Sequence, residues 1–126
     1  AGLKNVLPPL PLDVSKQPWP IADVDAVFSA NTTHIMSWPE VERMFEGVGD
    51  LLKVGRPFCL YGPFNKNGEF TSASNQAFDA DLKSRDPQMG VRDIGDLEVL
   101  AEKNGMVVED DVEMPANNRI LIWRRQ

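Results

Sequence analysis

The sequence is poor in the residues that build disulfides, metal centres and histidine-based active sites. It has one cysteine, Cys59, and one histidine, His34, in 126 residues. A single cysteine excludes an internal disulfide and a cysteine-rich metal centre, and we predict no metal site. Cys59 lies in the apolar run at residues 58–61, so we expect a buried, unreactive thiol in a reducing, cytoplasmic setting.

Long hydrophobic runs and excess positive charge are also missing. No apolar run approaches the roughly 18 residues of a membrane span, and residues 1–4 lack the apolar core of a signal peptide. Thirteen basic against 19 acidic side chains give a net charge of -6, the wrong sign for nonspecific binding to nucleic-acid backbones. We therefore expect a soluble, cytoplasmic protein without a membrane or nonspecific nucleic-acid partner.

The composition is that of an ordinary globular protein, with 42% hydrophobic and 25% charged residues. Its length suits one domain. Three of the ten prolines fall within residues 7–14, which restricts that segment to an extended run or an edge strand. We predict a single incomplete domain over 1–126, with an extended lead-in at 1–20 and a compact α/β part at 21–126.

Hydrophobic patterning divides the compact part into alternating strands and helices. Short apolar runs predict buried strands at 25–30 and 56–61. Helical spacing predicts helices at about 38–53, at 74–85 and around 94–101, the first capped by Ser37 and followed by Gly55. In the second, Ala77, Phe78 and Leu82 would share one face, and Asp93 would cap the third. Runs at 106–112 and 119–123 predict an antiparallel pair.

This order of elements predicts an α/β fold with a mostly parallel sheet and an antiparallel carboxyl-terminal strand. In such sheets ligands bind outside the carboxyl ends of the parallel strands. Those ends fall at residues 13–14, 29–31 and 61–64. We therefore expect the functional site at that edge.

Short peptides spread along the chain carry a family resemblance. They are LDV at 12–14, FSANTTHI at 28–35, YGPF at 61–64, SNQAFD at 74–79, RDP at 85–87, GVRD at 90–93 and MPANN at 114–118. In this order they resemble the carboxyl-terminal two thirds of the methyltransferase-like 26 family, a domain-of-unknown-function family of the class I S-adenosylmethionine-dependent methyltransferases. The resemblance implies a transferase with a partial Rossmann-like fold and S-adenosylmethionine as the cofactor of the intact parent.

One feature of that class is missing from the sequence. Class I enzymes bind the cofactor at a glycine-rich turn after their first strand, and Gly47, Gly49 and Gly62 do not follow a strand at the required spacing. We therefore expect a truncated domain without its N-terminal strands, inactive alone. The implied sheet order is the 25–30 strand, the 56–61 strand, the last strand and the 106–112 strand, with one exposed edge that favours a complementary piece or a homo-oligomer.

The resemblance also assigns cofactor contacts at strand ends. These residues are Asp13, Val14, Ser29, Ala30 and Asn31. Asp13 would accept a hydrogen bond from the adenine amino group, and Val14 would line the ring. Asp13 could instead turn the chain before Pro18, and Asn31 could satisfy only its own turn.

Polar and aromatic groups on the same side are candidates for the substrate and for a general base. The substrate candidates are Tyr61, Phe64, Asn75, Arg85, Asn117 and Asn118, and the unranked catalytic candidates are His34, Tyr61 and Asp79. Structural roles compete with these: a lone histidine is often structural, residues 117–118 could form a tight turn, and Asp79 could pair with Arg85. Trp19 and Trp38 could be core, lid or ring-stacking residues.

The predicted function is S-adenosylmethionine-dependent methyl transfer to an unknown acceptor, for which we favour a small molecule. The alternative is a noncatalytic α/β binding or assembly module that pairs through the open sheet edge. A hydrolase is disfavoured because the chain has no Gly-x-Ser-x-Gly turn and only one histidine.

Overall fold

The computed structural model of the chain describes residues 24–126. The predicted lead-in at 1–20, and with it Asp13, Val14 and Trp19, lies outside these residues. The described elements are β1 (Val27–Ala30), α1 (Trp38–Leu51), β2 (Pro57–Gly62), β3 (Phe64–Asn65), α2 (Ala73–Arg85), β4 (Arg92–Asp93), α3 (Ile94–Lys103), β5 (Met106–Met114), the 3-10 turn η1 (Pro115–Asn117) and β6 (Asn118–Arg125). Of the helices among them, none is long and apolar enough to cross a membrane.

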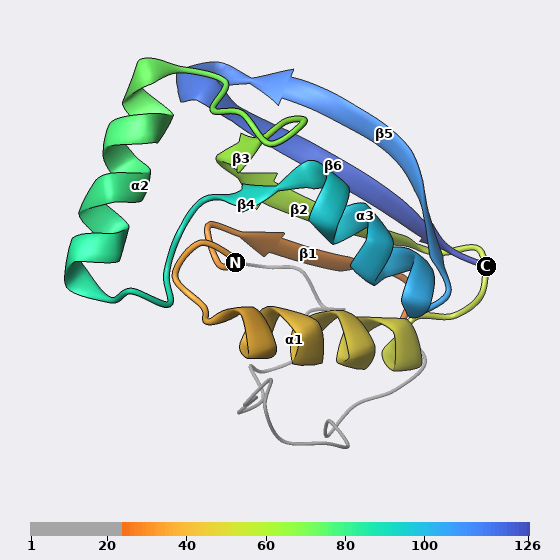
Figure 1. Cartoon of the computed structure of the whole chain (residues 1–126). Helices are drawn as coiled ribbons and strands as arrows, with labels where there is room; N and C mark the ends of the chain where they lie inside the picture. Colours follow the sequence, from red (N-terminus) through yellow and green to blue (C-terminus); the bar gives the residue numbers. More distant parts are fainter. Residues whose placement is uncertain (1–23) are drawn as a thin grey trace, which may run out of the picture.

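The strands form one four-stranded sheet in the order β1-β2-β6-β5 and a separate pair, β3-β4 (Figure 1). This is the predicted order of the main sheet. The expectation of a mostly parallel sheet is wrong, because only β1 and β2 run parallel in it, while β6 runs antiparallel to both of its neighbours. The cause is η1, a short hairpin connection that returns the chain beside β5 and inserts β6 next to β2.

Helix α1 begins and ends close to its predicted bounds. Ser37 accepts a hydrogen bond from the Glu40 backbone, and the Glu40 side chain accepts one from the Ser37 backbone, a reciprocal capping box. The helix ends at Leu51, two residues earlier than expected, and Gly55, with a φ of +83°, forms the turn that follows. An added Cβ at Gly49 would lie 2.5 Å from the backbone oxygen of Asn104, so this glycine allows α1 to pack closely against the end of α3.

Helices α2 and α3 differ in how they attach to the fold. Asp93 caps α3, as predicted, and accepts a hydrogen bond from the Gly95 backbone. In α2 only Leu82 of the three residues predicted to share an apolar face is buried, whereas Phe78 is 37% exposed. The other buried residues of α2 are Asn75 and Asp79. Polar contacts therefore replace the predicted apolar face of α2.

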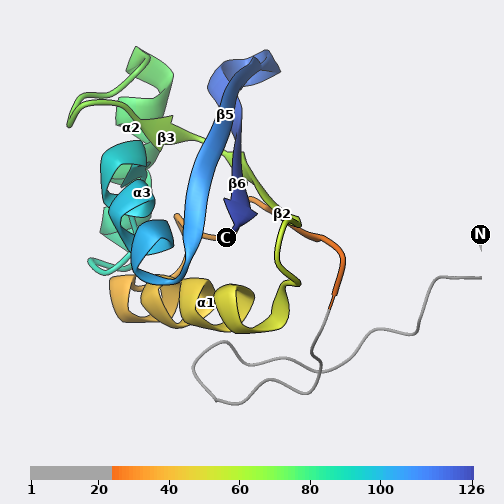
Figure 2. The same cartoon turned by 90° about the vertical axis from the view of Figure 1, so that its right-hand side faces the viewer.

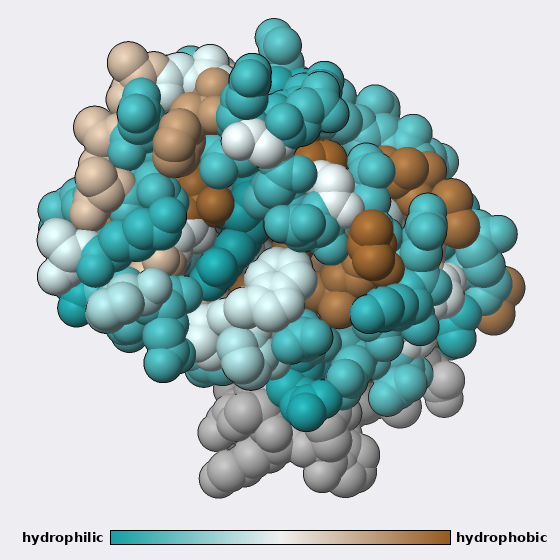
Figure 3. Space-filling view, viewed as in Figure 1, coloured by the Kyte–Doolittle hydropathy of each residue, from teal (hydrophilic) through white to brown (hydrophobic). Residues whose placement is uncertain are grey.

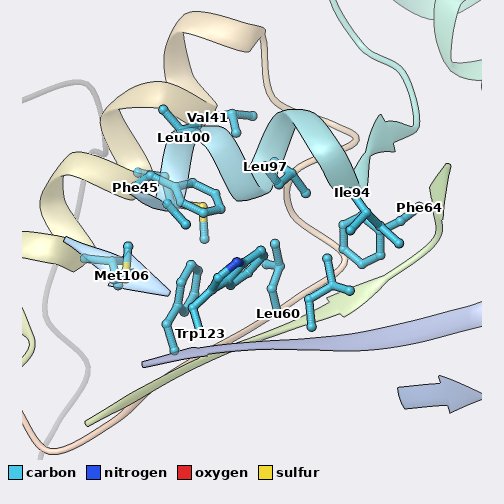
Figure 4. Packing of buried hydrophobic residues seen from close by; sticks show 14 of the residues in the cluster. Val41, Phe45, Leu60, Phe64, Ile94, Leu97, Leu100, Met106 and Trp123 are labelled. Atoms are coloured by element: carbon cyan, nitrogen blue, oxygen red, sulfur yellow. The ribbon is translucent and has the colours of Figure 1, made fainter. Parts of the chain in front are cut away.

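The core lies between the sheet and the helices and centres on three aromatic rings. The ring of Phe45 in α1 lies 5.4 Å from Phe58 in β2 and 5.4 Å from Trp123 in β6, edge-on to each. Figure 4 shows Phe45 and Trp123 beside Leu60 and Leu97, and the same cluster includes Phe58. Edge-to-face packing of this kind adds about 0.5–1.5 kcal/mol per pair to the free energy of burial.

All three helices lie on one side of the main sheet (Figure 2). On the side of β2 opposite Leu60, Cys59 is half-buried and not fully buried as predicted. Burial, followed by the charge of Glu109, raises the pKa of Cys59, while Arg124 opposes the shift. The predicted low reactivity of this thiol is consistent with that direction.

Strand β1 is an edge strand in residues 24–126, where its one strand neighbour is β2. Phe28 lies opposite Cys59 in the register, and its side chain is 65% exposed. The strand contains no lysine, proline or bulge of the kind that protects edges from pairing. Within the described part of the chain, the edge of the sheet at β1 is thus unprotected and lies beside an exposed aromatic ring.

The Phe45→Ala variant should lose about 3–5 kcal/mol of unfolding free energy, because it removes a buried ring that contacts two others. Urea denaturation measures this loss, and the milder Phe45→Leu variant should fall in between. As a matched control, Val99→Ala on the exposed side of α3 (57% exposed) should change stability by less than about 0.5 kcal/mol. Equal losses for Phe45→Ala and Val99→Ala would show that the core does not depend on this ring.

Candidate functional site at the carboxyl edge of the sheet

The ends of β1 and β2 meet at one edge of the sheet. Asn31 directly follows β1 with a φ of 56°, a left-handed conformation that asparagine tolerates better than most residues. Its backbone N–H donates to the carbonyl oxygen of Tyr61 at 2.8 Å, and the hydroxyls of Ser29 and Thr32 lie 2.8 Å apart. The chain therefore turns sharply where β1 stops and remains bonded to β2.

Arg92 of β4 holds the loop that follows this turn. Its guanidinium donates to the backbone oxygens of Thr33, at 3.2 Å, and of Met36. It also lies 5.8 Å from the centre of the Trp38 ring, a cation–π contact, and Trp38 packs against the hydrophobic core, one of the roles expected for it. Burial lowers the pKa of Arg92, and the nearby Asp79 opposes that shift. The loop is thus fixed by a cation at its centre.

Two of the three catalytic candidates are buried and engaged in packing or bonding. His34 is 6% exposed, and its ring lies 5.3 Å from that of Phe78. Burial, and after it the charge of Arg92, lowers the pKa of His34, so the ring is neutral at pH 7. Asp79 accepts a hydrogen bond from the Val91 backbone at 2.9 Å and pairs with Lys83 at 2.9 Å. These contacts give both residues structural roles, although the ion-pair partner of Asp79 is Lys83 and not the expected Arg85.

The third catalytic candidate, Tyr61, belongs to a polar network at the end of β2. The side-chain amide of Asn118 donates to the Tyr61 hydroxyl at 3.1 Å. Asn75 in α2 donates to the backbone oxygen of Asn117 at 3.2 Å, and Asn117 donates to the Ser74 hydroxyl at 3.0 Å. Of the predicted residues, Tyr61, Asn75, Asn117 and Asn118 are thereby brought together by hydrogen bonds.

The conformation of η1 explains how residues 117 and 118 reach this network. Ala116 and Asn117 both have positive φ angles, 62° and 60°, so the hairpin turns tightly, as the structural alternative for these residues expected. The turn also places the Asn117 carbonyl oxygen within hydrogen-bond distance of the Asn75 side chain. Turn and binding roles are therefore compatible at this position.

A cavity of about 160 Å³ lies beside the network. It is lined by Thr71, Glu113, Met114, Asn117, Asn118 and Arg119. Arg119 donates from Nε to Asp111 Oδ1 at 2.6 Å, and that hydrogen bond raises the pKa of Arg119. Four of the lining residues were not predicted as site residues. Opposite charges at 111 and 119 on either side of a predicted hairpin were the signal that could have indicated Arg119.

Two predicted substrate residues lie away from this network. Phe64 is 1% exposed and belongs to the hydrophobic core. Arg85 ends α2 and pairs with Asp81 at 3.1 Å, so the predicted ion pair between Asp79 and Arg85 is replaced by two others, Lys83–Asp79 and Arg85–Asp81. Ala30 is exposed at the end of β1.

Hydrophilic side chains cover most of the molecular face shown in Figure 3, where hydrophobic atoms form separate patches. Within residues 24–126 no group of three histidine, cysteine, aspartate or glutamate residues is arranged to hold a metal ion. The chemistry available at this edge therefore consists of hydrogen bonding by amides and hydroxyls together with a few charged groups.

A family model described as "Protein of unknown function (DUF938)" matches residues 1–125. Among solved structures, the mitomycin 7-O-methyltransferase MmcR superposes with a TM-score of 0.77 at 21% identity, over 93% of this chain and 33% of its own. An O-methyltransferase family 2 protein from Planctomyces limnophilus, solved with apigenin, gives a TM-score of 0.78 at 12% identity, over 90% and 34%. LepI, solved with SAH and a substrate analogue, gives 0.76 at 13% identity, over 93% and 30%.

These comparisons establish the α/β fold of methyltransferase domains for this chain. The chain spans about one third of the length of the solved structures that it matches.

Replacing Asn31 tests the left-handed turn. Asn31→Ala should lower the unfolding free energy by about 1 kcal/mol, because alanine adopts this conformation at a higher cost. Asn31→Gly is the matched variant, since it also removes the amide but tolerates the backbone angle. Urea denaturation of the two variants gives the comparison, and equal stability of the two would contradict a backbone role.

The buried His34 should make stability depend on pH. Folded His34 takes up a proton less readily than the same residue in the unfolded chain, so acid favours the unfolded state. Stability should fall as pH decreases below about 6.5, the unfolded value, toward the lower folded pKa. Urea midpoints between pH 8 and pH 5 should show a smaller decline for His34→Gln than for the unaltered chain, and parallel curves would disprove the assignment.

Proposed function

This chain belongs to the DUF938 family of proteins of unknown function, and we propose that it forms the carboxyl-terminal part of an S-adenosylmethionine-dependent methyltransferase. The observation that supports this most is the superposition of 93% of the chain on an O-methyltransferase with a TM-score of 0.77. Within the class, the peptides that resemble the methyltransferase-like 26 family support that subfamily. Because the chain spans about one third of its structural neighbours, we propose the activity for the whole protein.

The described residues fit one side of a cofactor site. Ser29, Ala30 and Asn31 lie at the end of β1, and Asn31 is held in place by its bond to Tyr61. Gly62, at the end of β2, lies beside the Asn31 side chain: a Cβ atom added to Gly62 would be 3.8 Å from Asn31 Oδ1, an ordinary van der Waals distance. The loop at 31–37 contains no glycine, so the glycine-rich turn that would hold the rest of the cofactor has to come from other residues.

We place that missing side beside β1. The edge of β1, which has no strand neighbour in residues 24–126, can accept a further strand, and a glycine-rich turn after such a strand would lie next to Asn31. Asp13 and Val14 remain proposed contacts for the adenine. The 126 residues alone would then be inactive, because the glycine-rich part of the cofactor site would come from other residues of the whole protein.

S-adenosylmethionine, when bound, supplies a methyl group already activated by its sulfonium, so the lone pair of the acceptor forms the new bond as the carbon–sulfur bond breaks toward sulfur. The chain's own part is to position the acceptor. The Tyr61 hydroxyl, fixed by Asn118, is the catalytic candidate best placed to hydrogen-bond an acceptor, because His34 and Asp79 are buried in other contacts.

One observation favours a second candidate function. Phe28 is 65% exposed beside the free edge of β1, which suits a noncatalytic α/β module that assembles with another chain through this edge. In that case a second copy would pair at β1 and no cofactor would bind.

Calorimetric titration with S-adenosylhomocysteine separates the two functions. We expect no binding to the 126-residue chain and binding to a longer form of the protein that carries an upstream strand and a glycine-rich turn. In that longer form Asn31→Gly should weaken binding about tenfold, the cost of one lost hydrogen bond to a charged group. Absence of binding to both forms would reject the cofactor assignment and leave the assembly function.

A further inference from the structure

Two Asn-Gly pairs occur in the chain, at residues 67–68 and 104–105. This dipeptide is prone to deamidation, because glycine has no side chain to hinder the attack of its backbone nitrogen on the preceding side-chain amide. The reaction needs a free asparagine side chain and a glycine nitrogen that is not held by another group. The two pairs differ in the groups that hold them.

Asn67 and Gly68 are the central residues of a tight hairpin turn. Lys66 and Glu69, which flank them, exchange backbone hydrogen bonds at 3.0 and 3.1 Å, and the two central residues have positive φ angles of 55° and 77°. This is the pattern of a type I′ turn, which favours Asn-Gly. The turn is exposed, and no residue that the structure describes hydrogen-bonds the Asn67 side chain. Its amide carbon is thus open to attack.

The attacking nitrogen, by contrast, is held by a carboxylate. The Gly68 backbone N–H donates to Asp93 Oδ1 at 2.7 Å, and charge-assisted bonds of this kind are stronger than neutral ones. The other oxygen, Oδ2, accepts from the Gly95 backbone at 2.9 Å and caps α3. Deamidation requires the Gly68 nitrogen to lose its proton and to turn toward the Asn67 side chain, and both steps break the bond to Asp93.

The second pair is held without a carboxylate. Asn104 Nδ2 donates to the Leu100 carbonyl at 2.9 Å, so this side chain is bound. The Gly105 backbone N–H donates to the Glu102 carbonyl at 3.1 Å, and the Gly105 carbonyl accepts from the Gln126 backbone at 2.8 Å. This pair is therefore an internal reference that does not depend on Asp93.

We infer that Asn67 is a site of spontaneous deamidation and that Asp93 sets its rate by holding the Gly68 nitrogen. In this reaction the Gly68 nitrogen bonds to the Asn67 amide carbon, ammonia leaves with the proton of that nitrogen, and water opens the resulting succinimide to aspartate or isoaspartate. The product places a new negative charge in a turn that is bonded to Asp93, and the like charges oppose that bond. The site is independent of the proposed function.

Incubation of the 126-residue chain at constant pH and temperature tests the inference, with peptide mapping by mass spectrometry to follow the deamidated fraction at each pair. Asn67 in the folded chain should deamidate about tenfold more slowly than in a free peptide of residues 63–72, the factor expected for one hydrogen bond to a charged group. Equal rates in the chain and in the peptide would overturn the inference.

Substitution of Asp93 identifies the group that is responsible. Asp93→Ser and Asp93→Asn each keep a residue that caps helices, but leave one side-chain oxygen for two backbone N–H groups. Both variants should deamidate at residue 67 about tenfold faster than the unaltered chain, while residues 104–105 keep their rate. The matched control is Asp96→Asn, which removes an exposed carboxylate from the first turn of α3 and should leave both rates unchanged.

Two results would overturn the role of Asp93 and with it the inference. The first is an unchanged rate at residue 67 in both Asp93 variants. The second is an equal rise at both Asn-Gly pairs, because that would report a general loosening of the fold and not the release of Gly68.

Discussion

The packing of Trp123 against Phe45 and Phe58 is the constraint on which the rest of this structure depends. These three rings join β6, α1 and β2, and burial of large aromatic side chains is among the strongest stabilising contributions in a small domain. Once β6 is held beside β2, its first residue, Asn118, lies at the carboxyl end of β2. Core packing at Phe58 and Trp123 fixes the pairing of β2 with β6, and this pairing brings Asn118 within hydrogen-bond distance of Tyr61.

The edge that carries the site is built mainly by polar contacts. Asn75 and Asp79 are the buried polar residues of α2, and each bonds to a backbone group, at Asn117 and Val91. Arg92 has the same role for the loop after β1. Such bonds fix geometry strongly because a buried polar group left without a partner is costly. Helix α2 is thus attached through these polar contacts, with Leu82 as its one buried apolar residue.

Much of the fold could be predicted because apolar spacing records it directly. Val41, Phe45 and Val48 repeat at the helical period in α1, and the run before Tyr61 indicates a buried strand. The mixed sheet and the polar face of α2 could not be predicted, since both depend on partners far along the chain. At the site, Tyr61 and Asn118 were predicted from strand ends and from a resemblance, whereas Glu113 and Arg119 depend on the register of β5 and β6.

The central place of β6 has a consequence for how the protein is made. This strand, residues 118–125, lies between β2 and β5 and contributes Trp123 to the core. During synthesis, β2 and β5 therefore have no common neighbour until residues 118–125 have left the ribosome. The main sheet is expected to complete only after that point. Within residues 24–126, a break in the chain before β6 would leave β1 and β2 as one pair and β5 without a strand partner.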